Sequence, residues 1–289
     1  MKNPVTVIEQ ADALDATSEK IIGVVSKVIP QGPVKDFLTG KWQGHPLHPV
    51  LTDIPIGFWV NSLVLDVVGG KRAQPAADRL LGLGILSSIP TVAAGLADWV
   101  DNYGDEQRVG LVHGSGNALA ILLYTGSYRA RKRGQRLKGL VLSLAGTGVV
   151  TAAGFLGGHL VYRLGNGVDQ TRFNHYAEDW TAVMPAAELP EKVATAVDAG
   201  EGKVMLYKDG PTICAIADKC SHRGGPLHEG EIDDAAGTVT CPWHASTFDL
   251  RSGAVRRTCR LVRWRCRGRP TSCLAAIAIA SYIASPAPT

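Results

Sequence analysis

Four apolar stretches between residues 50 and 163 most constrain what this chain can fold into: Val50–Gly69, Leu80–Val100, Val109–Tyr128 and Leu140–Tyr162. About 20 helical residues, rising about 1.5 Å each, cross a hydrocarbon layer of about 30 Å, so each stretch can span a bilayer. Frequent small residues suit close helix packing in lipid, and short connectors favour an up-and-down arrangement. The sequence predicts an all-α, four-helix transmembrane bundle over residues 46–165. A buried soluble bundle is the alternative, because polar residues and a proline interrupt the runs: Asp53, Asn61, Asp66 and Pro90.

Charges between the stretches predict the orientation of this bundle. The first and third connectors are basic, with Lys71, Arg72, Arg79, Arg129, Arg131, Lys132, Arg133, Arg136 and Lys138, whereas the second carries Asp98, Asp101, Asp105, Glu106 and Arg108. Because basic loops stay in the cytoplasm, both chain ends are expected on the opposite face of a bacterial cytoplasmic membrane. Residues 1–45 read as an amphipathic and polar segment without a cleavable signal peptide.

A second constraint is the pattern C-x-H-x18-C-x2-H, formed by Cys220, His222, Cys241 and His244. A structural zinc site more often pairs two cysteines in one turn and two histidines in another. Here each half supplies one thiolate and one imidazole, which suits two irons, one with two Cys ligands and one with two His ligands. Each half also has a characteristic flank: Gly224–Leu227, with two glycines and a proline as loop formers, follows the first pair, and Ala245–Asp249 follows the second.

With these flanks, residues 179–257 resemble a Rieske 2Fe-2S domain. The resemblance implies a small all-β domain of antiparallel sheets, with Cys220, His222, Cys241 and His244 binding the 2Fe-2S cluster in two loops. Strands are expected at Thr181–Met184, Lys203–Tyr207, Thr212–Ala217 and Thr238–Thr240, with a turn at Asp209 and Gly210. It also implies that Ser246 can donate to a cluster sulfur, and that Phe248 replaces a tyrosine of high-potential Rieske proteins. Gly225 and Trp243 occupy the positions of an extra cysteine pair in quinol-oxidising complexes, so the site looks ferredoxin-type.

Residues 42–170 resemble an uncharacterised family of small bacterial membrane proteins. The likeness rests on His45–Pro49, Ala97–Trp99, His113 with Asn117, and Gly157–Tyr162. It implies no chemistry of its own. Because helix directions alternate, His113 and His159 are expected at similar depth near one face, together with His45 and His48. Ligation of haem b by His113 and His159, quinone binding, and structural hydrogen bonding all remain open.

The remaining residues are a linker at 166–178 and a segment at 258–289. The latter has no acidic residue and three cysteines without ligand spacing, and is interpreted as an atypical basic and apolar tail, such as a shifted reading frame produces. Its apolar run Leu274–Ala284 is too short to span a bilayer.

These features predict a membrane-anchored protein that transfers single electrons at one membrane face. The expected partners are redox donor and acceptor proteins or quinone, and the lipid bilayer; no nucleic acid is expected. The chain is a component rather than a stand-alone catalyst. One alternative is a Rieske component of an oxygenase or quinol-oxidising system, although an oxygenase needs a mononuclear iron domain and only 45 residues follow His244. Another is a structural membrane protein with a vestigial or zinc-binding C-terminal module.

Overall fold

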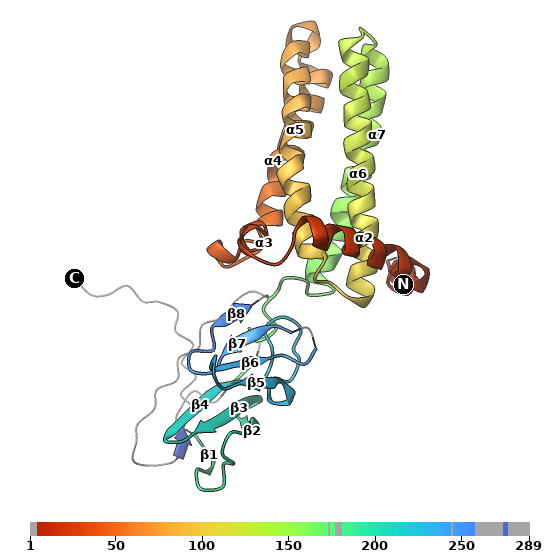
Figure 1. The fold of residues 1–289 in the computed structure, drawn as a ribbon. Coiled ribbons are helices and arrows are strands. Elements are labelled where there is room, and N and C mark those ends of the chain that lie inside the picture. Colours follow the sequence, from red (N-terminus) through yellow and green to blue (C-terminus); the bar gives the residue numbers. More distant parts are fainter. Residues whose placement is uncertain (1–4, 173, 177–180, 244, 258–273, 277–289) are drawn as a thin grey trace, which may run out of the picture. The chain divides into compact units, whose positions relative to one another are not determined.

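The computed structural model describes residues 5–172, 174–176, 181–243, 245–257 and 274–276. The chain divides into two compact units, Met1–Asn166 and Gly167–Thr289 (Figure 1), which are described separately. The first is helical, and its described elements are antiparallel long helices with a shorter N-terminal segment. The second is built from short antiparallel strands. The predicted fold class, a helical membrane domain followed by an all-β domain, is confirmed.

Within its described residues, the helical unit contains seven α-helices rather than the four that were predicted. The additional ones are α1 (Thr6–Glu9), α2 (Asp15–Val28) and α3 (Pro33–Leu38), with 3-10 turns at Asp12–Leu14 and Lys41–Gln43. The four long helices are α4 (Leu47–Val68), α5 (Gly70–Trp99), α6 (Gly104–Lys132) and α7 (Arg136–Tyr162). They form two hairpins, α4–α5 and α6–α7, visible as the two tall pairs in Figure 1.

The first hairpin reverses within two glycines. Gly70 has a φ of 61°, in the left-handed region that glycine adopts without steric cost. Helix α5 therefore begins at Gly70, ten residues before the apolar stretch that was predicted from Leu80. As a result, Lys71, Arg72 and Arg79 lie on a helix and not in an irregular connector.

Three of the four long helices are long and apolar enough to cross a membrane: α4, α5 and α7. The remaining predicted stretch, Val109–Tyr128, forms part of α6, which is long enough but less apolar. Its polar side chains are used inside the unit: His113 contacts the Ala153 carbonyl of α7, and Ser127 donates to the Gly139 carbonyl of the same helix. The lower hydropathy of α6 thus has a structural cause.

Aromatic packing joins the two hairpins midway along the helices. The rings of Trp59 on α4 and Tyr124 on α6 stack with centroids 4.3 Å apart. Both are buried together with Leu81 and Ala120. Gly84 of α5 leaves space for the Trp59 ring, since a Cβ on residue 84 would lie 2.3 Å from Nε1 of Trp59.

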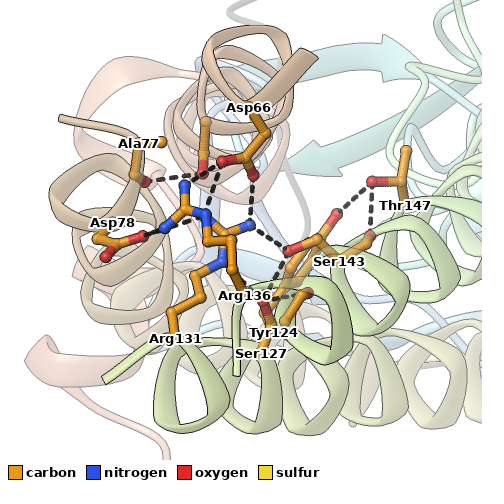
Figure 2. Close-up of polar contacts among 11 residues, drawn as sticks. Asp66, Ala77, Asp78, Tyr124, Ser127, Arg131, Arg136, Ser143 and Thr147 are labelled. Atoms are coloured by element: carbon orange, nitrogen blue, oxygen red, sulfur yellow. Dashed lines mark hydrogen bonds and ion pairs between the residues drawn. The ribbon is translucent and has the colours of Figure 1, made fainter. Parts of the chain in front are cut away.

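A buried ion-pair network joins the same hairpins near their reversals (Figure 2). The Arg131 side chain of α6 is 0% exposed and that of Asp66 of α4 is 3% exposed. Arg131 donates to Asp66 (2.5 Å), to Asp78 of α5 (3.2 Å), to Ser127 (3.1 Å) and to Ser143 of α7 (2.9 Å). Arg136 pairs with both aspartates as well. Two carboxylates thus meet two guanidinium groups, and the network carries no net charge.

The second unit holds nine described strands in three antiparallel sheets. One sheet orders β2 (Thr195–Ala199), β3 (Gly202–Asp209) and β4 (Thr212–Ala217), and another orders β5 (Glu231–Asp233), β6 (Thr238–Thr240), β7 (Thr247–Asp249) and β8 (Val255–Arg257). The third pairs β1 (Ala182–Pro185) with β9 (Leu274–Ala276), so part of the segment interpreted as a tail adds a strand. The four predicted strands correspond to β1, β3, β4 and β6, and Gly210 makes the predicted turn with a φ of 57°.

Replacing Arg131 with alanine should destabilise the helical unit strongly. The substitution removes one of the two guanidinium groups that pair with the buried Asp66 carboxylate, and losing one member of a buried ion pair typically costs about 3–5 kcal/mol. Unfolding of the full chain in mixed detergent micelles would measure the change in free energy. Arg129→Ala is the matched control, because Arg129 is exposed on the same helix and its loss should cost less than about 0.5 kcal/mol. Equal stability of the two variants would contradict the role of the network.

Candidate iron–sulfur site

The two predicted cluster loops have the same backbone hydrogen bonds. In the first, the Cys220 N–H donates to the Gly225 carbonyl (2.8 Å), and the Gly224 N–H donates back to the Cys220 carbonyl (2.8 Å). In the second, the Cys241 N–H donates to the Ser246 carbonyl (2.7 Å), and the Ala245 N–H donates back to the Cys241 carbonyl (3.0 Å). Each loop is therefore a tight turn that begins at a cysteine and closes five residues later.

Each loop also turns through a left-handed residue at the same place, four positions after its cysteine. Gly224 has a φ of 75° and Ala245 has a φ of 57°. Glycine fits this region, but alanine there costs of order 1–3 kcal/mol. Strain of this kind persists where surrounding structure fixes it and is often found at functional sites. The second loop keeps the same turn as the first in spite of that cost.

The loops bring the two predicted thiol ligands together. Cys220 is fully buried and Cys241 is 2% exposed, within the core of the β unit. A hydrogen bond with Cys241 and then burial raise the pKa of the Cys220 thiol far above its ordinary value, while the N–H groups of His222 and Arg223 act in the opposite direction. Two adjacent buried thiols would become thiolates only with a strong positive charge between them, which is what bound iron provides.

Of the two predicted histidine ligands, the structure describes only His222. His222 is half-buried in the first loop, two residues after Cys220. His244, the fourth expected ligand, lies outside the described residues. Among the described residues, no three His, Cys, Asp or Glu side chains converge in a way that could hold a metal ion. The structure thus unites the two cysteines, and the assignment of the histidines continues to rest on the sequence motif.

Ser246 supplies an independent test of fit for a cluster. Its side chain is 1% exposed, and its Oγ has no hydrogen-bond partner within the described part of the chain. A buried hydroxyl without an acceptor is costly, and a cluster sulfur beside Cys241 would be such an acceptor. Phe248, the expected replacement for a tyrosine, packs in the same core. The donor set and this hydroxyl therefore fit a 2Fe-2S cluster.

The two loops also meet at Gly225 and Trp243. A Cβ on Gly225 would lie 2.8 Å from the sulfur of Cys241 and 3.0 Å from the Trp243 ring. No side chain fits at position 225 without displacing the cysteine of the other loop. These are the two positions expected to hold a cysteine pair in quinol-oxidising complexes, and in this chain a glycine and a tryptophan lie against each other there.

Asp218 is a supporting residue that the sequence reasoning missed. It is buried two residues before Cys220 and accepts hydrogen bonds from the backbone N–H (2.7 Å) and the imidazole Nδ1 (2.8 Å) of His228. Its own carbonyl accepts from the Leu227 N–H (2.6 Å). Asp218 thereby ties the strand before the first loop to the turn after it. An aspartate before a Cys-x-His segment gives no periodic signal that would reveal this role.

Asp249 plays a similar part after the second loop. Burial alone would raise the pKa of this carboxyl group, but hydrogen bonds from Arg256 and Ser252 outweigh it and lower the pKa to about 2. The carboxylate also accepts from the backbone N–H groups of Arg251 and Ser252. Asp249 therefore fixes the turn between β7 and β8, which begins one residue after Phe248 in the sequence.

The membrane histidines have separate protein partners. His113 Nδ1 lies 2.7 Å from the Ala153 carbonyl and its Nε2 lies 3.2 Å from Asn117, while its ring packs edge-on against His48 at 6.2 Å. His159 Nε2 instead lies 2.6 Å from the carboxylate of Glu9 in the N-terminal segment. Both imidazole nitrogens of His113 and Nε2 of His159 are thus hydrogen-bonded to other groups of the protein. These contacts give the predicted haem or quinone site no support.

Comparisons with known proteins agree with this division. Residues 179–268 match the family described as "Rieske [2Fe-2S] domain", and residues 44–170 match "Predicted membrane protein (DUF2231)". The chain is 39% identical over 69 residues to the 3-phenylpropionate/cinnamic acid dioxygenase ferredoxin subunit of Escherichia coli (strain K12), covering 24% of this chain and 63% of that protein. It is 38% identical over 72 residues to apoptosis-inducing factor 3 of Homo sapiens, covering 25% of this chain and 12% of that one.

Among solved structures, the ferredoxin of carbazole 1,9a-dioxygenase from Nocardioides aromaticivorans IC177 is 30% identical, with a TM-score of 0.28. The match covers 30% of this chain and 83% of that one. The chain spans less than two thirds of the length of the two curated relatives named above.

The fold and the two family matches define a protein that joins an iron–sulfur domain to a helical membrane domain. The chain carries a Rieske [2Fe-2S] domain at residues 179–268, joined to a domain of the predicted membrane protein family at residues 44–170. The Rieske match extends beyond Arg257 into the segment interpreted as a tail. Residues 258–268 lie outside the described part of the structure.

Changing Cys220 to serine should abolish the cluster, because a serine oxygen replaces one of the two thiolates. Membranes containing the full chain would be reduced and examined by low-temperature electron spin resonance and iron analysis. Cys214→Ala is the matched control: Cys214 is also buried in this core, but it is not in a loop and should leave the signal intact. A Rieske spectrum that survives in Cys220→Ser would contradict the ligand assignment.

Proposed function

We propose that this protein is a membrane-anchored Rieske protein that passes single electrons between redox partner proteins at one membrane face. The observation that carries the proposal is the pair of loops that juxtaposes Cys220 and Cys241 in the core, beside the buried hydroxyl of Ser246. When bound, a 2Fe-2S cluster with two imidazole ligands accepts and releases one electron, at potentials of about −150 to +300 mV. Cys220, His222, Cys241 and His244 would hold it.

The described residues shape the surroundings of the cluster in two ways. Burial of both cysteines keeps their sulfur atoms away from water, and the Ser246 hydroxyl can stabilise negative charge on a cluster sulfur. The exposed side chain of Trp243, at 56% exposure, lies in the second loop next to the expected ligand His244. A partner protein can therefore approach the cluster loops directly.

The curated relatives support the choice of partner class. Proteins named as dioxygenase ferredoxin subunits share this region of the sequence, and by analogy the present chain exchanges electrons with proteins. We assign no redox group to the membrane domain, because His113 and His159 are each held by protein partners. The helical domain then serves to hold the Rieske domain at the bilayer.

Loop charge supports placing the Rieske domain on the non-cytoplasmic face. Arg131 and Arg136 are neutralised by Asp66 and Asp78 and add little to the charge of their connector. Seven basic residues nevertheless remain at the reversals of the two hairpins: Lys71, Arg72, Arg79, Arg129, Lys132, Arg133 and Lys138. By the positive-inside rule, these reversals lie in the cytoplasm.

A potentiometric titration of membranes tests the proposed function. The wild-type signal should follow a one-electron curve, and Ser246→Ala should lower its midpoint by about 40 mV, because a hydrogen bond worth about 1 kcal/mol no longer stabilises the reduced cluster. Thr247→Ala is the matched control, since that neighbouring hydroxyl lies beside Thr240. A sample that contains zinc and no redox signal would refute electron transfer. Equal midpoints would remove the role given to Ser246.

The orientation can be tested with reporter fusions. A reporter active only in the cytoplasm should be active after Gly134, at the α6–α7 reversal, and silent after Asp169, which follows α7. The reason is the excess of basic residues at the reversals. Activity after Asp169 with silence after Gly134 would place the cluster in the cytoplasm instead.

A further inference from the structure

The N-terminal segment, residues 5–43, is held by hydrogen bonds and ion pairs at one end of the bundle. This is the end where α5 finishes and α6 begins, opposite the two hairpin reversals. Arg108 of α6 donates two hydrogen bonds to the Asp15 carboxylate (2.6 and 2.7 Å) and one to the Glu9 carbonyl (2.7 Å). The Glu9 carboxylate contacts His159 of α7 at 2.6 Å. Farther along, Lys35 of α3 is buried in an ion pair with Asp101 (2.7 Å).

These contacts fix the direction of α2, which crosses the long helices in Figure 1 rather than following them. At about 100° per residue, one stripe of α2 faces the bundle: Ser18 and Val25 are buried and Ile22 is half-buried. Helix α2 packs on α6, and its first residue, Asp15, is bonded to Arg108 in the first turns of α6. It therefore lies near the end of the bundle where the candidate spanning helix α5 ends at Trp99.

The two flanks beside that stripe differ in chemistry. One flank presents Ile21, Val24 and Val28, of which the last two are 62% and 75% exposed. The opposite flank presents Glu19 and Ser26, and the outer edge carries Lys20 and Lys27, all of them exposed. An exposed row of three β-branched apolar residues is unfavourable in water, whereas lipid on that side would cover it.

The following turn repeats the pattern. Phe37 and Trp42 stack with ring centroids 5.9 Å apart, yet they are 59% and 63% exposed. Trp42 also donates from Nε1 to the Phe37 carbonyl. Stacked aromatic rings with one polar atom are typical of the boundary between hydrocarbon and headgroups.

We propose that residues 5–43 form an interfacial collar, in which α2 and the Phe37–Trp42 pair lie in the headgroup boundary of the bilayer that the long helices span. The occupant is the lipid surface itself. The long helices themselves expose apolar side chains, which include Val60 and Val64 of α4 and Leu86 of α5. Lys20 and Lys27 lie at the edge where their ammonium groups reach lipid phosphates.

The proposal of an interfacial collar depends on the proposed membrane location of the long helices. The following experiment tests the two proposals separately. The full chain is reconstituted in phosphatidylcholine vesicles with brominated acyl chains, and a single tryptophan is added at Val24, Ser26 or Leu86. The emission of the wild-type chain is subtracted from each. Val24→Trp should be quenched at least about two-fold more than Ser26→Trp, because only the first lies on the lipid flank. Val28→Trp is a second probe of that flank, and all four sites are exposed, so the fold tolerates the larger ring.

Each outcome decides one question. Quenching of Leu86→Trp without quenching of Val24→Trp and Val28→Trp would overturn the collar and leave the membrane location intact. No quenching of Leu86→Trp would overturn the membrane location and the collar together. A blue-shifted but unquenched Val24→Trp would mean that a second copy or another protein covers the flank, which also overturns the collar.

Discussion

The buried guanidinium group of Arg131 is the interaction on which the helical domain depends most. Its contacts reach all four long helices: Asp66 on α4, Asp78 on α5, Ser127 on α6 and Ser143 on α7. An arginine has five N–H donors in a rigid planar arrangement, and five acceptor contacts are present here. In an apolar environment such a group is tolerable only when every donor is satisfied. The arrangement therefore specifies one mutual position of the two hairpins.

The small residues around this network follow from the same requirement. A Cβ on Gly139 of α7 would lie 2.6 Å from Cγ of Arg131, so only glycine lets the arginine stem pass beneath α7. Ser127 and Ser143 contact each other at 2.8 Å and both contact Arg131. Residues that were predicted to allow general close packing thus serve a specific polar contact as well.

The sequence predicted the two parts of the chain with unequal success. The C-x-H and C-x2-H segments carry cluster chemistry within a few residues, so the loops could be predicted locally, and the shared turn at Gly224 and Ala245 agrees with them. The partner of Arg131 could not be predicted in this way. Asp66 lies 65 positions earlier, and in the sequence it looked like an interruption of an apolar stretch, while Arg131 looked like a loop charge.

The α6 helix shows why average hydropathy misleads in such a domain. An average counts each polar residue as if it faced lipid, but on α6 the side chains of His113, Thr125 and Ser127 bond to backbone carbonyls. A helix whose polar atoms are satisfied by its own turns and by neighbouring helices can lie among spanning helices while carrying more polar residues than they do. What matters for insertion is the surface left facing lipid, and on α6 that surface includes the exposed residues Leu119 and Leu122. Its lower apolar content is therefore compatible with a place inside the bundle beside α7.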